Sequence, residues 1–201
     1  MTKLLLASAN PGKLEEMQAL LEDLPIELVT LAQLGIHIDI EESGDTYAHN
    51  AAIKAQTCAQ LTGLLSLGDD SGLEVDALEG MPGIHSKRFS SKPGATDADR
   101  RAYLLERLAG KPRPWTARFR CTVALATPAG ELHIVEGECP GEIIPAERGQ
   151  NGFGYDPIFQ LVDLGLTMAE LSSQEKNRLS HRGRAIQASR PILTKLISQI
   201  R

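Results

Sequence analysis

Short apolar runs of strand length that alternate with stretches of helical spacing constrain the fold of this 201-residue chain more than any other feature. Residues 3–8 form the first such run, and the turn Asn10-Pro11-Gly12 then opens a helical stretch. Residues 26–30 are predicted to form a second strand. Residues 46–61 follow as a helix that begins at a threonine suited to cap it, and residues 64–68 form a third strand. Alternation of this kind is typical of an α/β protein.

The second half of the chain adds a long hairpin to this pattern. A helix is predicted over residues 96–108, again with a threonine at its start. Residues 115–144 are predicted to form two paired strands around the turn Pro128-Ala129-Gly130. The region from residue 167 onward has helical character, with a break or kink at Pro191. Together these elements predict an α/β fold with a mixed sheet.

The charge balance narrows the range of functions. The chain has 21 Lys and Arg against 26 Asp and Glu, a net charge of -5, and only 4% aromatic residues. A non-specific nucleic-acid binder needs a basic surface, so no nucleic-acid partner is expected.

No apolar stretch has membrane-spanning length, and the three widely spaced cysteines suit a reducing compartment and give no zinc-ligand pattern. We expect a cytoplasmic protein with no membrane partner, folded as a single domain over residues 1–201.

Two adjacent carboxylates, Asp69 and Asp70, follow directly on the apolar run at 64–68. Because successive strand residues point to opposite faces, the two side chains should leave the sheet in different directions. At a strand end that opens into a crevice, at least one of them is placed to hold a hard cation or to activate a water. The alternative is a strand followed by an ordinary Asp/Ser/Gly turn.

Residues 8–13, Ser8-Ala9-Asn10-Pro11-Gly12-Lys13, lie at a predicted strand-to-helix junction. Free backbone N–H groups and the helix dipole make such a junction a potential anion site, and Lys13 adds a positive charge. The spacing is not that of a P-loop. A routine turn with a solvent-facing lysine is the alternative.

One face of the helix predicted at 46–61 carries both apolar and polar residues. Asn50 and Lys54 are one turn apart on this face, which should pack inward. Because a buried amide and a buried ammonium are costly without partners, either the face borders a polar cleft or both residues find carboxylates inside the protein. The full face consists of Tyr47, Asn50, Ala51, Lys54, Cys58 and Leu61.

Three further segments have two interpretations each. The acidic segment 41–46 either stabilises the start of the following helix or supplies a carboxylate that completes a Mg²⁺ site with Asp70. The Gly-rich loop at 149–159 presents an aromatic ring on which a base stacks, or anchors itself in the core. The basic segment 176–184 places cations at a helix start after Ser180, where they bind an electron-rich group or form a solvated face.

Six of these segments occur in one order along nearly the whole chain. They are SANPGK at 8–13, EESGDT at 41–46, NAAIKA at 50–55, DDSGLEVDALEGMPGIHSKRFS at 69–90, FGYDPIF at 153–159 and KNRLSHRGRA at 176–185. In this combination the chain resembles the inosine/xanthosine triphosphate pyrophosphatase (ITPase) family. Any one motif is weak, but six in register are specific.

The resemblance implies an elongated mixed β-sheet flanked by helices, in two lobes with a central nucleotide-binding cleft, and a homodimer. It also implies hydrolysis, dependent on Mg²⁺ or Mn²⁺, of non-standard purine nucleoside triphosphates. The implied substrates are ITP, dITP, XTP and dXTP, which are cleaved between the α- and β-phosphates to the nucleoside monophosphate and pyrophosphate.

The resemblance also implies roles for individual residues. Asp70 would be the general base and a metal ligand, and Glu41 would be the second metal carboxylate. Lys54 would lie near the phosphates or the attacking water, and Phe153 would stack on the base. The implied substrate-binding residues are Ser8, Ala9, Asn10, Pro11, Gly12, Lys13, Ser71, Phe153, Gly154, Tyr155, Asp156, Lys176, His181 and Arg182.

The sequence departs from the family pattern at a few positions: Ala9, His49, His85 and Lys87 replace residues that are more usual there. Two other functions stay open. One is a Maf-like pyrophosphatase acting on pyrimidine or modified nucleotides, which the SHR and FGYDP segments disfavour. The other is a non-catalytic nucleotide-binding protein, which has no need of the set Glu41, Asp70 and Lys54.

Overall fold

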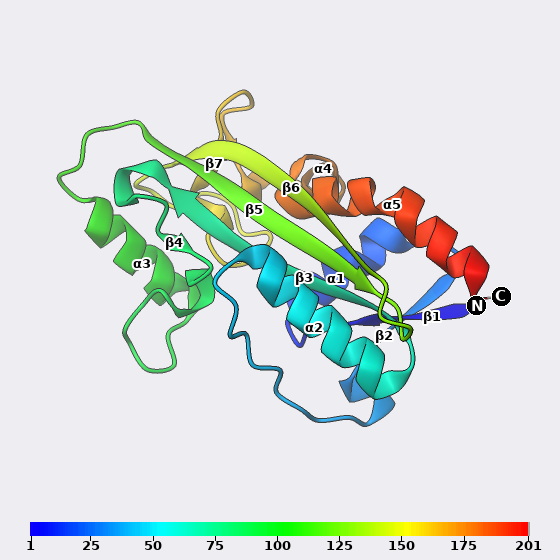
Figure 1. Ribbon diagram of the computed structural model, residues 1–201. Coiled ribbons are helices and arrows are strands. Elements are labelled where there is room, and N and C mark those ends of the chain that lie inside the picture. Colours follow the sequence, from blue (N-terminus) through cyan, green and yellow to red (C-terminus); the bar gives the residue numbers. More distant parts are fainter. Residues whose placement is uncertain (201) are drawn as a thin grey trace. The chain divides into compact units, whose positions relative to one another are not determined.

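A mixed sheet of eight strands organises the chain in the computed structural model, which describes residues 1–200 (Figure 1). The strand order is β2-β1-β3-β5-β6-β7-β8, and β4 pairs with β3. β1 is parallel to β2 and to β3, whereas β6–β7 and β7–β8 are antiparallel pairs. The strands are β1 Thr2–Leu6, β2 Ile26–Thr30, β3 Leu65–Val75, β4 Pro82–Gly83, β5 Trp115–Ala126, β6 Leu132–Ile143, β7 Phe159–Leu161 and β8 Leu166–Thr167. The predicted α/β fold with a mixed sheet is confirmed.

Helices start where the sequence places their caps. Asn10, Thr46 and Thr96 each accept a hydrogen bond from a backbone N–H in the first turn of the helix that follows. The helices are α1 Pro11–Leu21, α2 Tyr47–Thr62, α3 Asp97–Leu108, α4 Ser173–Leu179 and α5 His181–Gln199. Within residues 1–200, none of the helices combines the length and the apolar character that a bilayer crossing requires.

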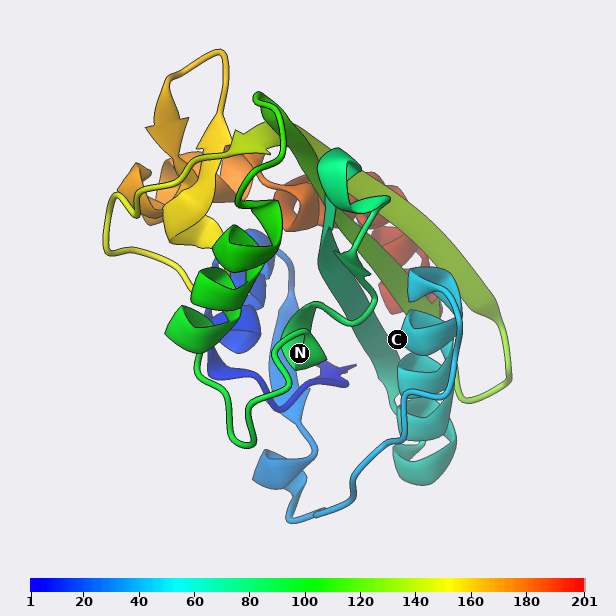
Figure 2. The same ribbon diagram turned by 90° about the vertical axis from the view of Figure 1, so that its left-hand side faces the viewer.

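The chain divides into two compact units, which are described separately. Unit 1 consists of residues 1–70, 121–137 and 182 onward. In it, α1 and α5 pack on one face of the strands and α2 packs on the other (Figure 2). Alternate residues of β1 serve the two faces, since Leu4 and Leu6 join the core with α1 and α5 while Leu5 joins Cys58 of α2.

Unit 2 consists of residues 71–120 and 138–181. Its core combines apolar side chains from the second half of β3, from α3, from the first half of β5 and from the segment at 155–171. The rings of Phe119 and Phe159 meet at 4.4 Å between centroids.

Three local predictions are wrong. The strand expected at 64–68 continues to Val75, so the acidic pair lies within β3 and is not followed by an ordinary turn. Leu61 is 50% exposed because the buried face of α2 ends at Cys58 and Ala59, one turn earlier. Of the break or kink expected at Pro191, the break is absent, because Pro191 lies inside α5 and the helix continues to Gln199.

Candidate active site

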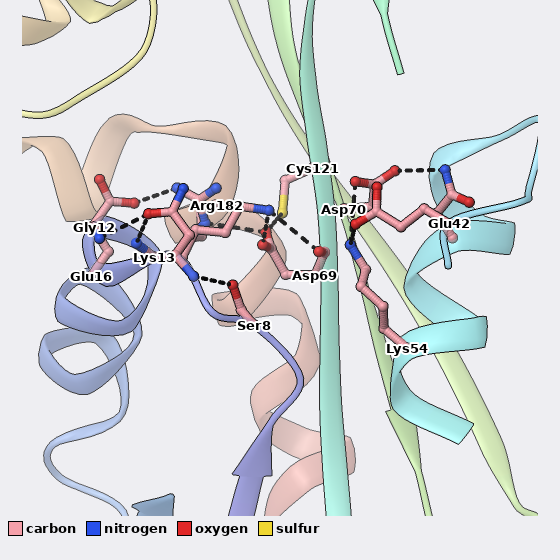
Figure 3. Close-up of polar contacts among 12 residues, drawn as sticks. Ser8, Gly12, Lys13, Glu16, Glu42, Lys54, Asp69, Asp70, Cys121 and Arg182 are labelled. Carbon is pink, nitrogen blue, oxygen red and sulfur yellow. Dashed lines mark hydrogen bonds and ion pairs between the residues drawn. The ribbon is translucent and has the colours of Figure 1, made fainter. Parts of the chain in front are cut away.

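Asp69 and Asp70 project from opposite faces of β3 in unit 1, as strand geometry predicts (Figure 3). The Asp69 side chain is fully buried, and that of Asp70 is 9% exposed. Asp70 pairs with Lys54 of α2, whereas Asp69 pairs with Lys13 of α1 and Arg182 of α5. The two neighbouring residues therefore belong to two different polar clusters.

The Asp70 cluster is built on α2. The amide nitrogen of Asn50 donates to Asp70 Oδ2 at 3.2 Å, and Lys54 Nζ lies 3.4 Å from Asp70 Oδ1. Lys54 Nζ also donates to Glu42 Oε1 at 3.0 Å (Figure 3). Of the two alternatives for the buried polar pair on this helix, the structure shows the one in which Asn50 and Lys54 find a carboxylate inside.

A glycine brings α2 close enough to make these contacts. A Cβ at Gly68 would lie 2.2 Å from the carbonyl oxygen of Ala51 and 2.9 Å from the backbone nitrogen of Ala55. Only glycine admits such an approach of helix backbone to strand. Because Gly68 directly precedes Asp69 and Asp70, the close approach lies beside the residues that carry charge.

Burial and charge act in opposite directions on Asp70. Burial raises the pKa of this carboxyl above its ordinary value, although Lys54 and Lys13 oppose the shift. Burial alone would lower the pKa of Lys54, but the carboxylates of Asp70, Asp69 and Glu42 raise it. The cluster thus pairs a carboxylate of increased proton affinity with an ammonium that keeps its charge, which suits a general base beside a fixed cation.

Asp69 lies at the centre of the second cluster. Lys13 and Arg182 both form ion pairs with its carboxylate, Arg182 through Nε at 3.2 Å from Oδ2. The thiol of Cys121 donates to the same oxygen at 3.1 Å, and Arg182 forms a second ion pair with Glu16. Burial would raise the pKa of Asp69, but Arg182 and Lys13 hold it well below its usual range. Asp69 is therefore a fixed negative charge that orients two cations.

The polar groups of the turn at residues 8–13 bond to one another, with Asn10 as the N-cap of α1. Asn10 Oδ1 accepts from the backbone N–H groups of Gly12 at 2.9 Å and Lys13 at 3.3 Å, and the Asn10 N–H donates to Ser8 Oγ at 3.2 Å. The expectation of free N–H groups at this helix start is therefore wrong for Gly12 and Lys13, because the side chain at the cap already satisfies them. The cationic contribution of this turn comes from the Lys13 side chain.

A third polar cluster lies in unit 2. Lys176 Nζ lies 2.5 Å from Asp156 Oδ2, and both residues are buried. The backbone N–H of Phe153 donates to the same oxygen at 2.9 Å, and Lys176 Nζ lies 4.9 Å from the centroid of the Phe153 ring. The ring of His181 stacks on Phe119 at 4.7 Å between centroids.

Of the two interpretations of the loop at 149–159, anchoring in the core is correct for two of its aromatic residues, and base stacking on the third, Phe153, stays a prediction. Tyr155 is buried and donates from its hydroxyl to the carbonyl of Ser86 at 2.9 Å, and Phe159 lies fully in the core. These two rings anchor the loop. Phe153 is only partly buried, so it is the aromatic ring of this loop that a ligand can reach.

A sequence model of the Ham1 family matches residues 4–192. The chain belongs to the Ham1 family. A dITP/XTP pyrophosphatase of Desulforamulus reducens is 45% identical over 195 residues, which cover 96% of this chain and 96% of that protein. One of Geobacter sulfurreducens is 46% identical over 187 residues, 92% and 94% of the two chains.

Solved Ham1 structures share the fold. A HAM1 protein from Coxiella burnetii superposes with a TM-score of 0.87 at 44% identity and covers 97% of this chain and 100% of its own. The Staphylococcus aureus Ham1 protein gives a TM-score of 0.84 at 34% identity over 96% of this chain and 99% of its own. The family relationship suggested by the six motifs is confirmed.

Glu42 is the residue of this Ham1 chain that sequence reasoning missed. Of the two adjacent glutamates, Glu42 pairs with Lys54 beside Asp70, whereas Glu41 is exposed. The acidic segment signalled a carboxylate here but not which of the two turns inward.

Within residues 1–200, no three His, Cys, Asp or Glu side chains are grouped so as to hold a metal ion. A site of one or two carboxylates, which is what Mg²⁺ requires from a protein, fits this region.

Proposed function

We propose that this chain hydrolyses ITP, dITP, XTP and dXTP to the nucleoside monophosphate and pyrophosphate, removing deaminated purines from the nucleotide pool. It is a nucleoside triphosphate pyrophosphatase of the Ham1 family, and relatives above 40% identity over nearly the whole chain bear the name dITP/XTP pyrophosphatase. The single observation that carries the catalytic proposal is the buried cluster of Asp70, Lys54 and Asn50.

In this proposal Asp70 is the general base. Its carboxylate accepts the proton of the attacking water, and burial raises its pKa toward the range that such a step needs. Lys54 holds the carboxylate in place and offsets the negative charge that develops on the phosphates. Asn50 fixes the other carboxylate oxygen, so one oxygen is oriented by an amide and the other by an ammonium.

We assign the metal to Glu41 and Asp70, with Mg²⁺ or Mn²⁺ as the ion. When bound, the ion neutralises charge on the triphosphate and orients it for in-line attack. Glu42 pairs with Lys54 beside Asp70, so the acidic segment that contains Glu41 reaches this cluster, which supports the assignment. Removal of divalent ions by EDTA should abolish turnover, and added Mg²⁺ should restore it.

Substrate binding is assigned to two groups of residues. Ser8, Ala9, Asn10, Pro11, Gly12 and Lys13, with Ser71, would hold the phosphates, and the cation of Lys13 lies beside Asp69 in support. Phe153, Gly154, Tyr155, Asp156, Lys176, His181 and Arg182 would recognise the nucleoside. In this group the partly buried Phe153 ring offers a face for stacking.

Base selectivity follows from hydrogen-bond chemistry. Hypoxanthine and xanthine present an acceptor at position 6, whereas adenine presents an amino donor there. Donors from Lys176 and His181 would pair with the acceptor and leave adenine unpaired, and an unpaired buried polar group is a strong basis for rejection. Equal hydrolysis of ATP and ITP would contradict this explanation.

The decisive experiment is pyrophosphate release from ITP, dITP, XTP, GTP, ATP and pyrimidine triphosphates with Mg²⁺. We expect the inosine and xanthosine forms to be preferred. Preference for pyrimidine triphosphates would favour a Maf-like pyrophosphatase, and tight binding without release of pyrophosphate would favour a non-catalytic binding protein.

Asp70→Asn tests the assigned base. The amide keeps the shape of the side chain but cannot accept the proton, so kcat should fall by about a hundredfold or more. The matched control is Asp163→Asn, the same change at an exposed position between β7 and β8, which should leave kcat unaltered. An Asp70→Asn variant that keeps most of its activity would remove this residue from the mechanism.

Three properties of the whole protein complete the proposal. We propose a homodimer, which light scattering coupled to size-exclusion chromatography tests directly. We also propose a cytoplasmic location without a nucleic-acid or membrane partner, for which the free cysteines Cys58, Cys121 and Cys139 and the acidic net charge of -5 give support. Finally, we propose that residues 1–201 form one domain.

A further inference from the structure

Both backbone polar groups of Gly154 are held by side chains of α3. The Gly154 N–H donates to Asp97 Oδ2 at 2.8 Å, and its carbonyl accepts from Arg101 Nη1 at 2.8 Å. These residues lie 57 and 53 positions away in the sequence, within unit 2. Gly154 has a φ of 63°, the left-handed region that glycine adopts without strain. The two bonds therefore fix a residue whose backbone would otherwise move readily.

The two holding side chains are themselves fixed. Arg101 is 13% exposed and forms a two-pronged pair with Glu147, with Nε at 2.8 Å from Oε1 and Nη2 at 3.0 Å from Oε2. Asp97 forms an ion pair with Arg100. Burial would raise the pKa of Asp97, but the bond from Gly154 and the pair with Arg100 lower it, so the acceptor is ionised at neutral pH.

Gly154 directly follows Phe153, the partly buried aromatic residue of the loop. The Phe153 N–H is tied to Asp156, and Lys176 lies 4.9 Å from the centre of its ring. With Gly154 held by α3, the loop is anchored at 153, 154 and 156. The direction of the Phe153 ring is thus set in part by residues that do not touch it.

We propose that Asp97 and Arg101, supported by Glu147, are positioning residues that set base affinity and base selectivity by fixing the loop that carries Phe153. The inference rests on the proposed function of Phe153 as the base-stacking residue. A loop released from α3 must be ordered when the base binds, and that ordering costs binding free energy. The phosphate-binding residues of unit 1 are unaffected by this cost.

The test compares a ligand that carries a base with one that does not. Arg101→Gln and Asp97→Ala should raise the KM for ITP by about tenfold, the order expected when a hydrogen bond to a charged group is lost. The preference for ITP over ATP, measured as the ratio of kcat/KM, should fall in the same variants. The inhibition constant of inorganic tripolyphosphate, which has phosphates but no base, should not change.

Control variants separate positioning from general damage. Arg107→Gln makes the same substitution on the same helix, where the guanidinium contacts Tyr103 and not the loop at Gly154, and should leave KM and selectivity unchanged. Asp97→Asn keeps an acceptor oxygen for Gly154 and should restore much of the affinity lost in Asp97→Ala. Glu147→Gln, at a half-exposed side chain, should give a smaller effect in the same direction without loss of fold.

The outcomes are distinct. An unchanged KM for ITP in Arg101→Gln and Asp97→Ala would overturn the inference, as would an equal weakening of ITP and tripolyphosphate. If the unmodified enzyme shows no preference for ITP over ATP, the proposed function itself fails, whatever the variants do. A preference in the unmodified enzyme that persists in the variants refutes the positioning role alone.

Discussion

At the scale of single residues, the site depends on glycines, because neighbouring atoms occupy the space where the Cβ of any other residue would lie. A Cβ at Gly152 would lie 2.1 Å from Asp156 Oδ2 and 2.8 Å from Lys176 Nζ. Gly152 also has a φ of 74°, which other residues rarely adopt. The buried pair of Asp156 and Lys176 therefore occupies the space that a side chain at residue 152 would need.

Gly152→Ala should consequently lower the free energy of unfolding by about 2 kcal/mol and raise the KM for ITP, since both backbone strain and overlap must be relieved. Gly130→Ala is the matched control: its φ is 93° but its Cβ would meet nothing within 4 Å. It should lose only the strain, about 1 kcal/mol, and keep the KM. Equal effects in the two variants, measured by urea unfolding and kinetics, would contradict the packing argument.

At the scale of elements, the position of α2 against β3 decides whether Asn50 and Lys54 reach Asp70. The helix approaches at Gly68, and its alanines Ala51, Ala55 and Ala59 pack against alanines of β5. Small residues on both sides allow this close packing. The chemistry of the Asp70 cluster thus depends on residues that carry no functional group.

Gly68→Ala should separate α2 from β3, because the added carbon would lie 2.2 Å from the carbonyl oxygen of Ala51. We expect the free energy of unfolding to fall by about 2 kcal/mol or more, with a loss of kcat as Lys54 and Asn50 are displaced. Gly63→Ala, at the C-cap of the same helix with open space around it, should lower stability but preserve kcat. If Gly68→Ala retains full kcat, the spacing of these elements does not govern catalysis.

Local signals in the sequence predicted the elements well. The helix starts at Asn10, Thr46 and Thr96 follow from cap chemistry, and the opposite directions of Asp69 and Asp70 follow from strand geometry. These features depend on residues a few positions apart.

Non-local features could not be predicted. The extension of β3 to Val75 runs through Asp, Ser and Gly, which disfavour strands, and is held by pairing with strands distant in sequence, β5 and β4. Glu42 lies in a segment that is neither helix nor strand, so no helical or strand periodicity indicates which of its side chains point inward. The contacts of Asp97 and Arg101 with Gly154 join segments more than 50 residues apart, which local patterns do not encode.

At the scale of the whole molecule, the two units share their long strands. β3, β5 and β6 each begin in one unit and end in the other, so neither unit holds a complete set of strands. Because three strands continue from one unit into the other, we expect the two units to unfold together, which supports the proposal of one domain.

We therefore expect a single unfolding transition. Fluorescence of Trp115, the only tryptophan, reports on unit 2, while far-UV circular dichroism includes α1, α2 and α5 of unit 1. The two signals should give the same urea midpoint. Separate midpoints would show that the units unfold independently.

The opposite orientation of the two neighbouring aspartates also limits how this segment can evolve. Because side chains alternate along β3, losing or gaining one codon just before Asp69 would exchange the two carboxylates between the faces of the sheet. The proposed proton acceptor would then face α1 and α5, and the carboxylate that pairs with Lys13 and Arg182 would face α2. Changes of length in this stretch are therefore incompatible with the proposed site.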